Sequence, residues 1–381
     1  MRFPLLLRVI IAIVLGVLVG LVAPDVLVRI MTTFNGLFDQ LLKFLIPLII
    51  LGLVTPAIAE VGKGAGKMLA ITVAIAYTFT VISGLFSYFV SSAMFPDMIS
   101  FHENLLPKEQ TDQFAPFFTI EIPPVMEVMT ALVLSFLAGI GIAAFDAEIM
   151  RRGFGEFRAV MSKTIGQIII PFLPVYIFGL FLKMTAEGQV GSVLITFAKI
   201  IIVIFLMTFI ILLFQYSIAA VVTRKNPFRL IVNMLPAYFT ALGTASSAAT
   251  IPVTLRQTEL NGVSKEVAGF VVPLCATIHL SGSTLKITAC AIAIMLMNNM
   301  PFDFPMMMGF ILMLGIVMVA APGVPGGAIM AALGILSSML GFNAEQQAMM
   351  ITLYVAMDSF GTACNVTGDG AIALIINKIK A

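Results

Sequence analysis

A run of polar side chains interrupts an apolar segment near the end of the printed sequence. The run, SFGTACNVTGDG, spans residues 359–370, and Asp358 immediately precedes it. Its hydroxyl, amide and carboxylate groups offer the oxygen ligands that hard cations prefer. Asp358 and Asp369 are 11 positions apart, which is about three helical turns or roughly 16 Å, so both face nearly the same way. Carboxylates at that separation cannot share a proton, which excludes an aspartyl protease.

The composition indicates that this run lies inside a membrane protein. Of the 381 residues 60% are hydrophobic and 10% are charged, and the mean hydropathy is +1.10; soluble domains carry roughly 25% charged residues. The net charge of +2 comes without a basic run, so no nucleic-acid partner is expected. The sequence has no nucleotide-binding motif, and its three cysteines lack metal-ligand spacing and are expected to be packing residues.

Eight apolar segments are long enough to cross a bilayer. Lys and Arg concentrate in short cytoplasmic loops, and their distribution puts both termini in the cytoplasm. We therefore expect a multi-pass protein of the inner (plasma) membrane whose first segment is retained rather than cleaved. The predicted spans are residues 5–23, 37–59, 68–94, 128–145, 165–184, 190–222, 268–297 and 348–376.

Two further apolar stretches, residues 227–255 and 302–342, are each interrupted in the middle. The interruptions are GTASSAATIPV at residues 243–253 and APGVPGGA at residues 321–328. Non-helical backbone survives at membrane depth only where it is buried in protein or lines a cavity. We expect two re-entrant helical hairpins with tips near the midplane; a pair of kinked through-spans would satisfy the loop charges equally well.

Each hairpin precedes a span with a polar interruption. The seventh span carries ATIHLSGST at residues 276–284, and the eighth carries the run at residues 359–370. Hairpin followed by broken helix therefore occurs twice, starting from opposite sides of the membrane. Paired interruptions of this kind indicate the binding site of a secondary transporter. We expect the site where two hairpin tips and two unwound helices meet.

The order of these parts resembles the glutamate-transporter family, the dicarboxylate/amino acid:cation symporters, over the whole chain. NVTGD at residues 365–369, SSAATIPVT at residues 246–254 and GVPGGA at residues 323–328 are similar to the family's span-eight motif and its two hairpin tips. The resemblance implies an all-α, elevator-type symporter, not an enzyme, that moves an amino acid, acidic or small and neutral. A C4-dicarboxylate or another carboxylate is the alternative substrate. Sodium or a proton would be the coupling ion, with no other cofactor.

The resemblance also implies a homotrimer in the lipid bilayer, in which a transport domain moves against a fixed scaffold. The scaffold would comprise residues 1–67, with spans one and two, and residues 96–184, with spans four and five. The transport domain would comprise span three at residues 68–95 and everything in residues 190–381. An anion channel, a side activity of family members, is a competing class that a substrate-gated current without accumulation would favour.

The resemblance assigns roles to individual residues. Asp358 would bind a substrate ammonium, which favours an amino acid because a dicarboxylate carries no cation; a structural hydrogen bond is the alternative. Asp369 would help to bind sodium through its carboxylate, or would pair with hydroxyls for structure. The implied substrate site is Ser246, Ser247, Ser283, Lys286, Val324, Gly326, Asp358, Gly361, Thr362 and Asn365, and the implied sodium site is Cys275, Thr277, His279, Asn365 and Asp369.

Several positions depart from the family pattern. The span-seven motif Asn-Met-Asp-Gly-Thr is His-Leu-Ser-Gly-Ser here, so Ser281 replaces an ion-binding aspartate and His279 an asparagine. Gly361 and Ala245 stand where some members carry a substrate-binding arginine. The second hairpin also lacks the family's hydroxyl residue between Met318 and Pro322. The changes at Ser281 and His279, together with this missing hydroxyl, predict sodium dependence that is weaker or involves fewer ions.

Two ionisable residues inside the predicted seventh span leave alternatives open. Lys286 would pair with a substrate carboxylate in place of the missing arginine, fill a lost sodium site as a tethered cation, or snorkel towards an interface. His279 would carry a proton where relatives carry sodium, or form a structural hydrogen bond.

Overall fold

The computed structural model describes residues 5–62, 67–99, 114–188, 190–319, 321 and 325–380. Within these ranges every regular element is a helix, and seven helical runs are long and apolar enough to cross a bilayer. The expected all-α membrane fold is therefore confirmed. The expected number of crossings and re-entrant hairpins remains a prediction.

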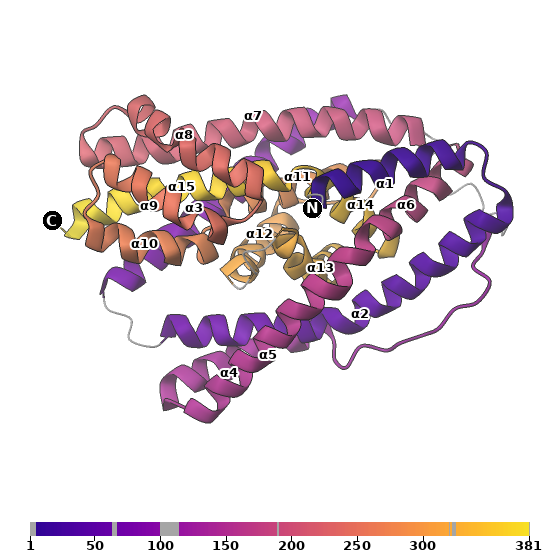
Figure 1. Cartoon of the computed structure of the whole chain (residues 1–381), viewed down its shortest axis with the longest axis horizontal. Coiled ribbons are helices and arrows are strands. Elements are labelled where there is room, and N and C mark those ends of the chain that lie inside the picture. Colours follow the sequence, from indigo (N-terminus) through magenta and orange to yellow (C-terminus); the bar gives the residue numbers. More distant parts are fainter. Residues whose placement is uncertain are drawn as a thin grey trace.

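Long helices form the first half of the chain, and the described residues 114–127 before α4 are irregular. Pro47 and Pro56 lie inside α2, and Figure 1 shows this helix changing direction along its length. A proline removes a backbone hydrogen bond and bends the helix that contains it. The elements are α1 Leu5–Gly20, α2 Asp25–Gly62, α3 Lys67–Met98, α4 Val128–Phe145, α5 Glu148–Thr164, a π-helical turn Ile165–Ile169, α6 Ile170–Ala186 and α7 Val190–Thr223.

The helix bounds differ from the predicted spans in two places. Residues 128–145 match α4, but α2 begins well before the predicted residues 37–59. The stretch expected to be a loop before the fifth span forms α5, which continues through the π-helical turn into α6. Its charges lie outside the core, where Arg151 pairs with Asp146 at 3.0 Å and with Glu148 at 2.7 Å. A charged amphipathic helix therefore looks like a loop when only charge is counted.

Shorter helices separated by interruptions form the second half. α8 packs along α9, and α12 packs along α13, so both interrupted apolar stretches have the predicted helix–break–helix form. Their re-entrant position in a membrane remains a prediction. The elements are α8 Pro227–Thr244, α9 Ser247–Leu260, α10 Lys265–Ile278, α11 Ser281–Met297, α12 Phe304–Val319, α13 Gly327–Leu340, α14 Ala344–Ala356 and α15 Asp358–Lys380.

The two hairpin tips each contain a residue with left-handed backbone. Ala245 has φ 49° and ends α8, after which Ser246 caps α9 by accepting a hydrogen bond from the Ala249 amide at 3.3 Å. Gly326 has φ 75° and precedes α13, a conformation that glycine adopts without steric penalty. The tips therefore expose the first N–H groups of two helices, which have no partner inside their own helix.

The interruptions in the last two predicted spans differ in length. His279 and Leu280 separate α10 from α11, within the polar stretch that was expected to break the seventh span. In the eighth span only Met357 lies between α14 and α15, and residues 359–370 are helical. The expectation that this polar run unwinds is therefore wrong. Its helix begins at Asp358, and an acidic residue in the first turn is favoured by the helix dipole.

The helices pack in two groups with a smaller set between them (Figure 1). α1, α2, α4, α5 and α6 pack against one another. α3, α7, α8, α9, α10, α11 and α15 form the second group, and α12, α13 and α14 contact both groups. This arrangement is compatible with the predicted scaffold and transport domain, and the movement between them stays a prediction.

Close packing of α11 against α15 yields a prediction for Gly282. A Cβ atom there would lie 2.7 Å from both the Cβ of Cys364 and the carbonyl oxygen of Gly361. Gly282→Ala should push the two helices apart and reduce the free energy of unfolding by about 1–3 kcal/mol. The thermal unfolding midpoint of the detergent-purified protein should therefore fall. Gly269→Ala on α10 is the matched control, because nothing lies within 4 Å of a Cβ at Gly269. Equal midpoints for the two variants would contradict the packing.

Candidate functional site

Three interrupted elements meet at the start of α15. The Gly326 amide at the tip of the α12–α13 hairpin donates to Oδ2 of Asp358 at 2.7 Å. The Gly282 amide in the first turn of α11 donates to Oδ1 of Asn365 at 2.8 Å. Both donors belong to helix starts, whose N–H groups lack partners within the helix. Two side chains of α15 therefore satisfy the amides exposed by the interruptions in α10–α11 and α12–α13.

Ser283 links the same helices through its hydroxyl group. Its Oγ accepts hydrogen bonds from the Tyr354 hydroxyl at 3.0 Å and from Nδ2 of Asn365 at 3.1 Å. Thr362 lies nearby along α15, where its Oγ1 donates to the Asp358 carbonyl at 3.0 Å. All of these side chains are buried. The structure thus brings Ser283, Asp358, Thr362 and Asn365 together, as the sequence motifs predicted.

Lys286 on α11 enters this cluster with no exposure to solvent. Its Nζ donates to the Met357 carbonyl at 3.1 Å and lies 3.7 Å from Oδ1 of Asp358. The ammonium also sits 4.0 Å from the centroid of the Tyr354 ring, which gives a cation–π contact. The snorkelling alternative is therefore wrong, because the side chain ends inside the protein on a carbonyl, a carboxylate and an aromatic face.

Gly361 leaves the space that Lys286 fills. A Cβ atom at Gly361 would overlap Cε and Nζ of Lys286. Any larger residue at this position would have to push the lysine head away from Asp358. The lysine and the glycine are therefore a sterically coupled pair on two different helices. We call Lys286, Asp358, Gly361 and Tyr354 the lysine cluster.

A second buried cluster surrounds His279. Its Nδ1 lies 3.0 Å from Oδ1 of Asp369, and its Nε2 lies 3.5 Å from Nε2 of Gln215 on α7. Gln215 also donates to Oγ of Ser281 at 3.1 Å. Oε1 of Gln215 is buried without a hydrogen-bond partner among the described residues. We call His279, Asp369, Gln215 and Ser281 the histidine cluster.

The predicted sodium ligands are only partly gathered around Asp369. The Cys275 carbonyl accepts the backbone N–H of His279 at 2.8 Å, which ends α10. Thr277 is exposed, and its hydroxyl donates to the Leu274 carbonyl at 2.8 Å. The imidazole of His279 therefore occupies one oxygen of the carboxylate that was expected to face a sodium ion.

Three of the remaining predicted substrate residues, Ser246, Ser247 and Gly326, lie at the two hairpin tips. Ser246 and Ser247 begin α9, which packs along α10 and α15. Gly326 reaches the site through its amide, as described above. Val324 lies outside the described residues.

Sequence reasoning missed two polar residues that complete the clusters. Gln215 lies in the last third of the apolar helix α7, and a polar amide inside an apolar helix is a sequence signal for a functional position. Tyr354 precedes Asp358 by one helical turn in sequence and is fully buried. Its hydroxyl binds Ser283 while its ring faces Lys286, so it touches both parts of the site.

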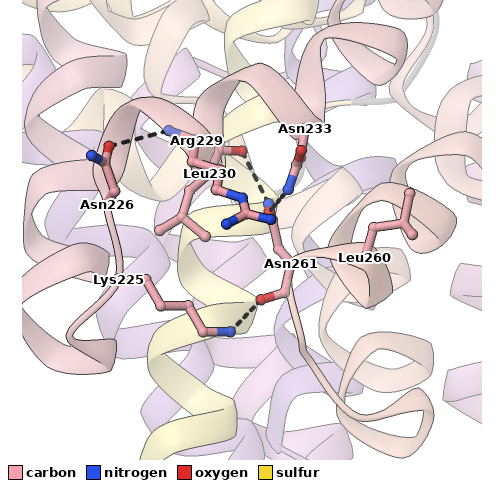
Figure 2. Close-up of a pocket in the computed structure, with 7 residues that line it drawn as sticks. All are labelled: Lys225, Asn226, Arg229, Leu230, Asn233, Leu260 and Asn261. Atoms are coloured by element: carbon pink, nitrogen blue, oxygen red, sulfur yellow. Dashed lines mark hydrogen bonds between the residues drawn. The ribbon is translucent and has the colours of Figure 1, made fainter.

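A cavity of about 360 Å³ lies elsewhere, between the α7–α8 turn and the end of α9 (Figure 2). Its polar lining groups bind one another. Asn261 accepts from Nζ of Lys225 at 2.5 Å and from Nδ2 of Asn233 at 2.8 Å, and it donates to the Leu230 carbonyl at 3.0 Å. The cavity shares no residue with either cluster, and its contacts hold one end of the first hairpin in place.

Comparisons of the sequence with known proteins identify its family. The profile of the sodium:dicarboxylate symporter family matches residues 5–379. The serine/threonine transporter SstT of Acinetobacter baumannii (strain AYE) is 28% identical over 384 residues, covering 97% of this chain and 95% of the relative. Human excitatory amino acid transporter 2 is 37% identical over 161 residues, 42% of this chain and 28% of the relative. The match over nearly the whole length confirms the resemblance inferred from the motifs, and this chain belongs to the sodium:dicarboxylate symporter family.

Proposed function

We propose that this protein is a secondary symporter that moves an amino acid, acidic or small and neutral, across the cytoplasmic membrane. The observation that carries the proposal is the meeting of three interrupted helical elements around Ser283, Asp358 and Asn365. Interrupted helices supply polar groups inside a membrane domain, and transporters bind substrates there. The relatives named for amino acid transport support this class. A C4-dicarboxylate is the second candidate, supported by the family description.

The proposed substrate site is built around Asp358, whose carboxylate would bind the ammonium group. Ser283, Thr362 and Asn365 offer hydroxyl and amide groups nearby, and the tips carrying Ser246, Ser247, Val324 and Gly326 would cover the substrate. Burial of Asp358 supports this assignment, because burying an ionisable side chain inside a membrane domain costs free energy and such residues mark functional sites. The protein would act as a carrier without catalysing a reaction.

Sodium is the proposed coupling ion, as the family description suggests. Asp369, with the carbonyls of Cys275, His279 and Asn365, and Thr277 nearby, would form its site. The contact between His279 and Asp369 argues for weaker binding than a freely available carboxylate would give, because the imidazole competes for one oxygen. A proton is the alternative coupling ion, with His279 as its carrier.

The proposed assembly is a homotrimer with both termini in the cytoplasm. Positive loop charges support the orientation. An elevator movement of residues 68–95 and 190–381 against residues 1–67 and 96–184 is supported by the two packing groups of helices.

The first prediction for this site concerns Asp358→Asn. An amide cannot balance a buried ammonium, and loss of one partner from a buried charge pair costs about 3–5 kcal/mol, or over a hundredfold in affinity. Calorimetric titration of the purified protein with serine, threonine, alanine and aspartate should therefore show no measurable binding to the variant. Asp97→Asn on α3 is the control, because Asp97 is exposed, and its affinity should equal that of the wild type. Wild-type affinity in Asp358→Asn would remove this carboxylate from the substrate site.

The second prediction concerns the driving ion. Coupling requires ion and substrate to favour each other's binding reciprocally. The contact with His279 should weaken sodium binding at Asp369. Ser281, in place of an ion-binding aspartate, should lower the number of coupled sodium ions and so make the dependence on sodium shallow. Proteoliposomes should accumulate labelled amino acid under an imposed sodium gradient less steeply than a multi-sodium symporter. If a proton substitutes, an imposed pH gradient alone should also drive uptake, and His279→Gln should abolish that response. Accumulation that rises steeply with sodium and ignores pH would contradict this assignment of the histidine cluster. Accumulation of succinate but of no amino acid would favour the dicarboxylate alternative.

A further inference from the structure

The Lys286 ammonium occupies the position on Asp358 where a substrate cation would bind. Within the described residues, Asp358 is the only acidic side chain in ion-pair contact with Lys286, and the reverse also holds. Lys286 is not exposed, and the side chain of Asp358 is 9% exposed. Two buried opposite charges that face only each other form a unit with no net charge. A ligand that binds here without leaving an unpaired charge must therefore bring no net charge of its own.

The contact between the two charges is loose. Nζ and Oδ1 are 3.7 Å apart, longer than a hydrogen bond. The shorter polar contact of Lys286 is with the neutral Met357 carbonyl, and its ring contact is with Tyr354. Separating Lys286 from Asp358 therefore breaks an electrostatic attraction but no close hydrogen bond.

The carboxylate presents its two oxygens to different partners. Oδ2 of Asp358 accepts from the Gly326 amide at 2.7 Å, while Oδ1 faces Lys286. A cation that replaces Lys286 at Oδ1 leaves the contact with the hairpin tip intact. Substrate binding and tip closure can therefore use the same carboxylate at the same time.

We propose that Lys286 is a tethered stand-in for the substrate ammonium, and that an amino acid binds by exchanging ion-pair partners. The substrate ammonium takes the place of Lys286 on Asp358, and the released Lys286 ammonium pairs with the substrate carboxylate. No covalent bond changes and no proton moves in this exchange. The inference rests on the proposed amino acid transport and adds the charge class of the substrate.

Charge balance makes this exchange selective for zwitterions with one carboxylate. Such a substrate brings one positive and one negative charge, so all four charges are paired after exchange. An amine leaves Lys286 without a partner, and a simple carboxylate leaves Asp358 without one. A dicarboxylate or an acidic amino acid adds a carboxylate for which the lysine cluster has no cation. An unpaired charge in a buried site is strongly unfavourable, so each of these ligands should bind more weakly.

Gly361 acts as a positioning residue for this exchange. Because a Cβ at this position would overlap the lysine head, Gly361→Ala should move Nζ away from Asp358 while both charges remain. The variant therefore tests the geometry of the pair separately from its charges.

The test uses serine and its two truncated analogues on the full-length purified protein. Ethanolamine is serine without the carboxylate, and 3-hydroxypropionate is serine without the ammonium. Wild-type protein should bind serine by calorimetry and bind both analogues at least about a hundredfold more weakly, the factor expected for one unpaired buried charge. Lys286→Met should lose this preference and bind ethanolamine at least as tightly as serine. Lys199→Met on α7 is the matched control and should behave as the wild type.

Further variants keep the test decisive if Lys286→Met does not fold. Gly361→Ala should weaken serine binding, and Lys286→Met/Asp358→Asn, which leaves no unpaired charge, should be monodisperse and bind neither serine nor ethanolamine. Serine affinity unchanged in both Lys286→Met and Gly361→Ala, with serine bound by the wild type, would overturn the exchange and leave amino acid transport intact. Wild-type binding of succinate but of no amino acid would instead overturn the proposed function, and the exchange with it.

Discussion

The burial of opposite charges beside each other is the constraint on which the site depends. Lys286 and Asp358 come from different helices, and neither charge is tolerable alone at this depth. Asp358 lies at the start of α15, directly after Met357. The Met357 carbonyl accepts from Nζ of Lys286 in addition to the backbone amides of the first turn of α15. Oδ2 of the same carboxylate accepts a hydrogen bond from the Gly326 amide at the hairpin tip. Asp358 therefore takes part in the charge pair, in the start of α15 after the helix interruption and in the contact with the hairpin tip.

The histidine cluster also contains a buried carboxylate, but its partner is not a permanent cation. Asp369 is also buried, but its neighbour His279 can be neutral, so this pair does not fix a charge as the lysine does. Gln215 and Ser281 complete the contacts around the ring. A carboxylate with an adjustable partner can accept a cation or a proton from outside, whereas a carboxylate with a tethered ammonium accepts a cation only by exchange. The start of α15, at Asp358, is thus suited to the proposed substrate, and its middle, at Asp369, to the proposed coupling ion.

Sequence periodicity and loop charge predicted the elements better than the contacts of the site. α4 and both interrupted hairpins follow from apolar length and from glycine and proline positions. α5 was missed because its charged surface resembles a loop. Residues 359–370 are helical despite their polarity, and within them Asn365 and Asp369 bind groups on neighbouring helices. The pairing of Lys286 with Asp358 could not be deduced from the sequence. It requires the space left by Gly361, which lies on a different helix from Lys286. Contacts between helices carry no periodic signal in one sequence.

The self-paired site bears on how an unloaded carrier crosses the membrane under the proposed elevator movement. A transport domain that moves through the bilayer with an unpaired carboxylate carries a large electrostatic penalty. Lys286 neutralises Asp358 from within the chain, so the substrate site has no net charge whether a zwitterion is bound or not. The barrier to return is then set by tip closure and by the charge at Asp369. Coupling to an ion would accordingly be controlled at the histidine cluster, while Lys286 keeps the substrate cluster neutral in both directions of movement.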